Sequence, residues 1–166
     1  MPSTPKSAKS VGAWNRFFRR RPSAARVRQF TVFLEYRVGR LQNLLEVLEF
    51  PGHVIRAISL EESGESTLVR FICSDPDEAR KVLQGASFPF GELDLIAVQT
   101  AQNSPKPLAS ICSVLLSAEI NIHYLYPFLA APRGKALALY VDDPVLAGQL
   151  LIKKGFTLIS ESDLKG

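Results

Sequence analysis

The chain has 166 residues and a formal net charge of +4, and none of its apolar runs reaches the roughly 18 residues that a membrane-spanning helix needs. Residues 1–28 hold eight basic side chains and no acidic ones, whereas residues 29–166 hold twelve basic and sixteen acidic ones, which leaves this body with a charge of −4. The length suits one domain or two small ones, and the acidic body gives no support to a nucleic-acid-binding surface on it.

Residues 1–28 are rich in Pro, Ser, Ala and Arg, a composition typical of segments that are disordered in isolation. Within them, 14–21 interleaves aromatic side chains with arginines. Three interpretations stay open: a solvated basic tail, a contact with an anionic surface such as lipid, RNA or an acidic protein patch, and an organelle presequence. We therefore predict a basic, disordered tail at 1–28.

The body of the chain begins at Gln29 and alternates strand and helix patterns. Residues 30–36 are rich in β-branched and aromatic residues and predict a strand, and the apolar positions of 41–48 follow the period of a helix that Pro51 and Gly52 end. In chain order, the remaining predicted elements are strands at 53–60 and 66–73, a helix opened by Asp75 and Pro76, strands near 88–92 and at 93–100, a helix at 107–118, strands at 121–126 and 135–141, a helix at 144–153 and a strand at 156–160.

Strand, helix, strand, strand, helix, strand is the order of a ferredoxin-like βαββαβ unit, and it occurs twice. A shift of 67 residues brings the two copies into register, placing 39–41 on 106–108 and 54–58 on 121–125. We therefore predict an α+β fold of two tandem repeats, 29–92 and 93–164, with antiparallel sheets and the helices on one face. Whether the last strand of the first repeat is separate from 93–100 or fused with it stays open.

The first predicted hairpin, 53–73, is apolar on both faces. With a turn centred on Ser63, Ile58 and Ile72 share one face, and Ala57 and Phe71 share the other, which would lie under the helices. A solvated face would be polar, so we expect the second repeat or another subunit to cover the outer one.

The cysteines indicate the redox compartment. Cys73 and Cys112 both lie in apolar segments, as expected for two reduced, buried thiols, and we therefore expect a cytoplasmic protein. A disulfide between them is the alternative.

The sequence offers little catalytic material. It has two histidines and no nucleophile elbow, phosphate-binding loop or zinc-ligand spacing. Asp142 and Asp143 suggest a paired-carboxylate site, but they precede Pro144 and fit helix capping better. We therefore predict no catalytic residue, no metal site and no cofactor.

With these elements and this repeat, the sequence resembles a small stand-alone protein with two tandem ACT domains, the regulatory modules that bind amino acids. The resemblance rests on Ile-Arg-Ala-Ile-Ser-Leu at 55–60 and on Ile-Asn-Ile-His-Tyr-Leu-Tyr at 120–126, and it covers about 29–164. Three positions depart from the family pattern: Val38 stands where the first turn has proline, Lys106 where the second has glycine, and Val54 where the other repeat has Asn121.

The resemblance implies a ligand site between the first strand–helix loop of one repeat and the second strand of its neighbour. Free amides at a helix N-terminus attract a carboxylate, a glycine lets a ligand approach the backbone, and an asparagine amide can receive an ammonium group or donate to a carboxylate. The better hybrid site would join Arg37, Gly39, Arg40 and Leu41 with Asn121, Ile122 and His123. The complementary site, Lys106 and Leu108 against Val54 and Ile55, lacks the asparagine, and whether one, both or neither binds stays open.

Each candidate also has a purely structural interpretation. Gly39 can serve only as a turn residue, Asn121 can close the preceding helix, and His123 can be a polar strand residue. Arg56 and Arg70 form a second candidate anion site if they lie cross-strand, where like charges destabilise unless an anion intervenes. Pairing with nearby glutamates is the alternative for these arginines.

The function implied by the resemblance is a non-catalytic amino-acid sensor. It would be a homodimer that modulates a biosynthetic enzyme such as acetolactate synthase, with branched-chain or aromatic amino acids as first candidates for the effector. A ligand-free interaction scaffold with the same fold is the alternative. RNA-recognition sheets share the fold class, but the strand at 67–71 lacks their glycine–aromatic pattern, so nucleic acid is not expected as a partner of the body.

Overall fold

The computed structural model describes residues 25–100 and 104–166. Its elements, in chain order, are β1 (Arg26–Glu35), α2 (Arg40–Leu48), β2 (Ile55–Ser63), β3 (Ser66–Cys73), α3 (Pro76–Gly85), β4 (Phe90–Gln99), α4 (Pro107–Leu116), β5 (Ile122–Pro127), β6 (Ala136–Val141), α5 (Pro144–Lys153), β7 (Leu158–Ile159) and α6 (Glu161–Leu164). Within these residues, no helix has the length and apolar character that crossing a bilayer requires. Most of the tail predicted at 1–28 lies outside the described residues.

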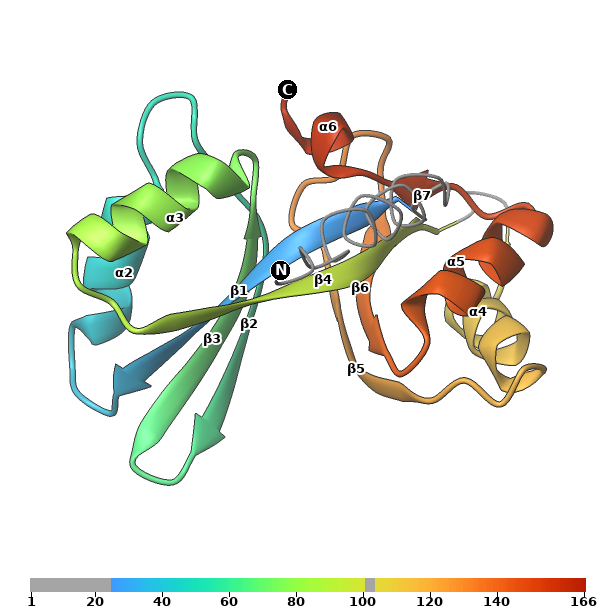
Figure 1. The fold of residues 1–166 in the computed structure, drawn as a ribbon, viewed down its shortest axis with the longest axis horizontal. Helices are drawn as coiled ribbons and strands as arrows, with labels where there is room; N and C mark the ends of the chain where they lie inside the picture. Colours follow the sequence, from blue (N-terminus) through green and yellow to red (C-terminus); the bar gives the residue numbers. More distant parts are fainter. Residues whose placement is uncertain (1–24, 101–103) are drawn as a thin grey trace, which may run out of the picture.

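One antiparallel sheet runs through both repeats in the order β2-β3-β1-β4-β6-β5, with β7 also paired to β4 (Figure 1). The first part of β4 pairs with β1, from Phe90 opposite Val32 to Ile96 opposite Arg26. Its last part pairs with β6 and β7. The strand whose division was left open is therefore continuous, and the α+β fold of tandem ferredoxin-like repeats is confirmed.

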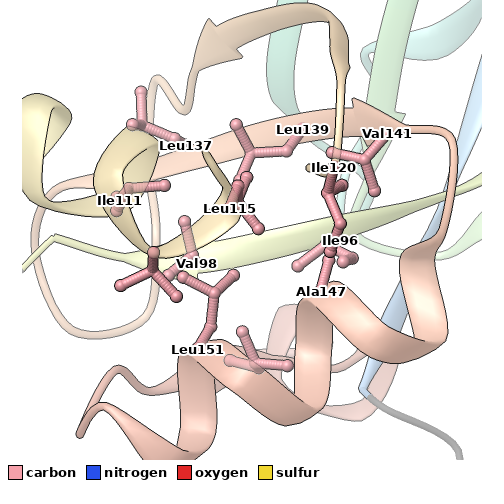
Figure 2. Close-up of a cluster of buried hydrophobic side chains, with 12 residues drawn as sticks. Ile96, Val98, Ile111, Leu115, Ile120, Leu137, Leu139, Val141, Ala147 and Leu151 are labelled. Carbon is pink, nitrogen blue, oxygen red and sulfur yellow. The ribbon is translucent and has the colours of Figure 1, made fainter. Parts of the chain in front are cut away.

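Each repeat buries one sheet face under its own two helices. In the first repeat, Phe30 and Phe71 stack with ring centroids 5.6 Å apart, in the same core as Leu44 of α2 and Leu83 of α3. In the second repeat, side chains from β4 and β6 meet side chains from α4 and α5 (Figure 2). Both helix pairs are thus held to the sheet by apolar burial on their inner faces.

A third core joins the repeats through the sheet faces that carry no helix. Ile72 on β3 is buried there, so the second repeat covers the outer face of the β2–β3 hairpin, and Ala57 forms a bridge with Phe128. The predicted face of Ala57 is wrong: a register shift between Ile55 and Ala57 reverses the alternation, so Ala57 joins the third core and Ile58 packs toward the helices.

A buried polar cluster lies inside this third core. Gln29 is 0% exposed, and its side-chain amide oxygen accepts a hydrogen bond of 2.8 Å from the Tyr126 hydroxyl. Its amide nitrogen donates to the Tyr124 hydroxyl at 2.9 Å and to the Thr31 hydroxyl at 3.1 Å. Burial raises the pKa of Tyr126 well above its usual range, so this hydroxyl stays protonated and able to donate. The cluster fixes β1 of the first repeat against β5 of the second.

Two further positions differ from prediction. β1 begins at Arg26 rather than at Gln29, because Arg26 and Val27 pair with the shared strand β4. Cys112 is exposed rather than buried, because α4 turns Ile111 and Leu115 toward the core instead. Cys73 is buried as predicted, and its burial, with a smaller contribution from Glu49, raises the pKa of this thiol to about 12.

Replacing Gln29 with alanine tests the buried polar cluster. The Gln29→Ala variant leaves the Tyr124 and Tyr126 hydroxyls without their shared partner, so we expect the free energy of unfolding to fall by about 2–3 kcal/mol in urea unfolding of the full chain. Gln42→Ala, which removes an exposed amide on α2, is the matched control and should change stability by less than about 0.5 kcal/mol. Equal effects of the two variants would contradict the role of Gln29 in joining the repeats.

Candidate functional site

The connection between β1 and α2 forms an open cavity of about 390 Å³. All four residues predicted for the first half of the ligand site line it: Arg37, Gly39, Arg40 and Leu41. Leu34 of β1, Leu60 of β2 and Thr67 of β3 complete its apolar side, together with Tyr36 and Val38. The spacing in the sequence therefore gathers these residues around one space large enough for a small molecule.

Gly39 leaves the start of α2 accessible. Its φ of 86° is left-handed, and a Cβ placed on it would meet no other atom within 4 Å. No side chain among the described residues caps this helix end. The first amide groups of a helix have no partner inside the helix and carry its positive partial charge, so this end of the cavity suits a carboxylate.

Arg40 places a guanidinium group beside the same cavity. The group lies 5.4 Å from the centre of the Phe88 ring, and its buried Nε has no hydrogen-bond acceptor within 25–100 and 104–166. Arg37 is exposed on the loop. Both side chains add positive charge to the side of the cavity that the helix N-terminus already favours for anions.

The second half of the predicted site lies at the start of β5. The Asn121 backbone amide donates to a carboxylate oxygen of Asp142 at 3.1 Å, and its carbonyl accepts from the Asp142 amide at 3.3 Å. Ile122 pairs with Val141, and the exposed His123 has its ring centre 4.8 Å from that of Tyr140. These contacts hold the backbone of the segment while the Asn121 side chain stays exposed.

The two halves do not meet within one chain. None of Asn121, Ile122 and His123 lines the β1–α2 cavity. Figure 1 shows the β1–α2 connection at the left end of the molecule and the α4–β5 connection at the right. A site that uses both halves therefore requires two chains.

The complementary loop of the second repeat differs from the first. Lys106 precedes α4 with a φ of −139°, so it does not take the left-handed conformation that Gly39 has before α2. On the opposing strand, the Val54 amide donates to the Ser74 hydroxyl at 3.1 Å, and Val54 offers no polar side chain. The two candidate sites are therefore unequal in geometry as well as in sequence.

Arg56 and Arg70 have separate partners. Arg70 pairs in register with Ser59 and forms an ion pair of 2.6 Å with Glu61, and its guanidinium lies 4.4 Å from the centre of the Tyr124 ring. Arg56 donates to the Leu164 carbonyl at 2.9 Å. The two arginines are not cross-strand neighbours, because the hairpin turns between Ser63 and Ser66 rather than around Ser63, which places Ser59 opposite Arg70. The glutamate partner that the sequence also allowed is present for Arg70.

The neighbouring carboxylates cap helices. An Asp143 oxygen accepts from the Leu146 amide at 2.9 Å at the start of α5, and Asp75 accepts from the Asp77 and Glu78 amides at the start of α3. The capping predicted from the sequence is confirmed for both helices. In the part of the chain that the structure describes, no three His, Cys, Asp or Glu side chains gather as metal ligands would.

An ion-pair network that the sequence analysis missed lies between β1, α3, β4 and α6. Arg28 donates a hydrogen bond of 2.9 Å to Asp77 and lies 3.4 Å from Glu161. The Nε and Nη2 atoms of Arg80 donate to the two carboxylate oxygens of Glu92. Hydrogen bonds from these arginines hold the pKa of Asp77 and of Glu92 below their usual values. The network was missed because residue 28 was assigned to the tail.

The comparisons with known proteins agree with this fold. A family model described as an ACT domain pair matches residues 25–166. The chain is similar to protein BT0572 from Bacteroides thetaiotaomicron, with 28% identity, a TM-score of 0.76 and coverage of 86% of this chain and 99% of that one. None of the curated proteins gives a significant match.

Two regulatory structures share the fold at lower identity. The ligand-free regulatory subunit of aspartate kinase from Thermus thermophilus is 12% identical, with a TM-score of 0.51 and coverage of 79% of this chain and 93% of that one. A structure of aspartokinase alpha and beta subunits is 15% identical, with a TM-score of 0.50 and the same coverage of 79% and 93%. At these identities the likeness concerns the fold alone.

The ion-pair network predicts how acid destabilises the protein. Because the folded-state pKa of Glu92 lies below the ordinary 4.5, the pair contributes stability above pH 4.5, and this contribution is lost as the pH falls through the folded-state pKa. We expect the free energy of unfolding, measured in urea at decreasing pH, to fall less with acid in Arg80→Gln, which lacks the partner. The exposed Lys81→Gln is the control, and equal acid sensitivity in the two variants would contradict this assignment.

Proposed function

The chain belongs to the ACT domain pair family, and on that premise we propose that it is a non-catalytic regulatory protein that binds a small amino-acid effector. The open β1–α2 cavity carries the proposal, because it combines an uncapped helix N-terminus, two arginines and an apolar wall. This is the chemistry that an α-carboxylate and an apolar side chain require. No catalytic step is part of the proposal.

The effector's functional groups have matching partners in this proposal. Its carboxylate binds at the start of α2, beside Gly39 and Arg40, and its side chain packs against Leu34 and Leu60. Its ammonium group is received by the side-chain amide oxygen of Asn121. The apolar wall favours branched-chain or aromatic amino acids as first candidates.

The effector site forms between two copies of the chain. The separation of the cavity from Asn121 within one chain supports this arrangement, as does the apolar rim of the cavity, where Val38 and Leu60 are largely exposed. An effector that bridges two chains stabilises the dimer and biases its assembly by mass action. Ligand occupancy would thereby alter the surface that a partner enzyme meets.

The partner in this proposal is an enzyme of amino-acid metabolism in the cytoplasm, with acetolactate synthase as the first candidate. The repeats of the proposed regulator are 29–92 and 93–164, extended by the start of β1 at Arg26, and the basic segment before β1 contacts an anionic surface. A ligand-free oligomerisation scaffold is the second candidate function. The hybrid site at Lys106 lacks the left-handed glycine found at Gly39, which supports the absence of a ligand from that second site.

Thermal melting of the full chain with each of the twenty amino acids tests the proposal. A bound effector at about 100 times its Kd should stabilise the fold by about 2.7 kcal/mol, which raises the Tm measurably. We expect a selective shift that Asn121→Ala abolishes, because this variant removes an exposed amide without changing a hydrogen bond of the fold. Gly39→Ala should abolish it as well, since alanine is strained at a φ of 86°.

Matched variants separate loss of binding from loss of stability. Asn43→Ala makes the same side-chain change on the exposed face of α2, away from the cavity lining. Gly155→Ala introduces the same backbone strain at a φ of 90° in the second repeat. Both controls should keep the ligand-induced shift. If none of the amino acids changes the Tm of the unmodified chain, the sensor is refuted in favour of the scaffold.

A further inference from the structure

A charged stretch interrupts the helix-covered face of the sheet. Because side chains alternate along a strand, Arg26 and Arg28 of β1 share a face with Phe30, which packs beneath α2 and α3. Opposite them on β4, Asp94 shares that face with Ile96, which packs beneath α4 and α5. The charged residues therefore lie between the two helix pairs, and Figure 1 shows the stretch of β1 and β4 that passes between them.

A cleft of about 540 Å³ opens at this charged stretch. The pairing of β4 with β6 ends at Ile96 and Leu139, beyond which β4 continues along β1 alone. The resulting wedge, the central cleft, is lined on one side by Arg26 and Asp94 and on the other by Tyr140 and Asp142. Its size is within the usual range for small-molecule sites, and it is separate from the β1–α2 cavity.

The charges of the central cleft are incompletely paired. Arg28 and Glu92 belong to the ion-pair network, but Arg26 and Asp94 are 3.8 Å apart, which is too far for a hydrogen bond. The buried Nε of Arg26 has no acceptor within 25–100 and 104–166, and the Asp94 side chain is 57% exposed. The Arg26 side chain as a whole is 34% exposed, so a carboxylate in the cleft would bind its outer guanidinium nitrogens rather than the buried Nε.

We propose that the central cleft is a second amino-acid site, in which Arg26 binds the carboxylate and Asp94 and Asp142 bind the ammonium group. A zwitterion matches the cleft because both signs of charge face the same space, and Leu93 and Val141 supply apolar lining for its side chain. A simple anion would leave the carboxylates of Asp94 and Asp142 without a partner of opposite charge, and a simple cation would leave Arg26 without one. This site does not depend on the β1–α2 cavity binding a ligand.

Two residues that line the central cleft also contact the β5 segment that we assign to the effector site. Asp142 holds the Asn121 backbone by two hydrogen bonds, and the centre of the Tyr140 ring lies 4.8 Å from that of His123, with the rings tilted by 35°. A ligand that contacts Asp142 and Tyr140 therefore acts on the residues that position Asn121. If the ligand of the central cleft changes the affinity of the effector by some factor, the effector changes the affinity of that ligand by the same factor.

Isothermal titration of the full chain with each of the twenty amino acids tests the central cleft. In the Gly39→Ala variant, which disables the β1–α2 site, we expect at least one amino acid to bind still. Arg26→Gln and Asp94→Asn should each weaken that binding by about tenfold or more, because each removes one charge-assisted contact. Arg133→Gln, an exposed arginine whose nearest carboxylate is 4.0 Å away, is the matched control and should bind as the unmodified chain does.

The outcomes separate this proposal from the effector proposal. If Gly39→Ala binds no amino acid, or if Arg26→Gln and Asp94→Asn both bind normally, the central cleft is not a ligand site. If acetate binds as tightly as the amino acid, the site is for anions and the zwitterion is wrong. Binding of an amino acid that is lost in Arg26→Gln but kept in Gly39→Ala and Asn121→Ala supports the central cleft. The β1–α2 effector site is refuted only if, in addition, no amino acid loses binding in Gly39→Ala or Asn121→Ala. Urea unfolding of each variant confirms that it is folded.

Discussion

The ten residues of β4 pair with β1 at one end and with β6 and β7 at the other, so one strand completes the first repeat and begins the second. This sharing makes the sheet continuous and turns the helix-free faces of the two repeats toward each other. Those faces are apolar, and they bury each other in the third core around Ile72 and Ala138. Apolar burial alone does not fix the relative position of the two repeats. Gln29 does, because its side chain must hydrogen-bond two tyrosine hydroxyls of β5 at once.

The shared strand also sets the positions of the two proposed ligand sites. It places the β1–α2 connection and the α4–β5 connection at opposite ends of the molecule, which is why we propose an effector site shared between two chains (Figure 1). It also separates the two helix pairs and leaves between them the central cleft, which Arg26 and Asp94 line. Gly39 is left-handed whereas Lys106 has a φ of −139°, so the two loops differ although the repeats share a fold.

Local signals in the sequence predicted much of this. The helix periods and the helix caps Asp75 and Asp143 depend only on residues close together in the chain, and they appear in the structure. The 67-residue repeat can be read by comparing two segments of the sequence, without knowing how they pair. The start of β1 at Arg26 and the bulge near Ala57 depend on pairing with strands distant in the sequence, so no local sequence pattern predicts them. Likewise, the sequence identified residues that line the β1–α2 cavity, but the distance from that cavity to Asn121 is a property of the folded chain.

The central claim is that loop and strand from different chains build one effector site, and complementation between two inactive variants tests it most directly. Gly39→Ala and Asn121→Ala chains, unfolded together and refolded as a mixture, form mixed dimers in which the intact loop of one chain faces the intact strand of the other. The account predicts that the mixture regains the effector-induced rise in Tm that neither variant shows alone. A mixture that stays unresponsive, although mixed dimers are present, would contradict a site shared between chains.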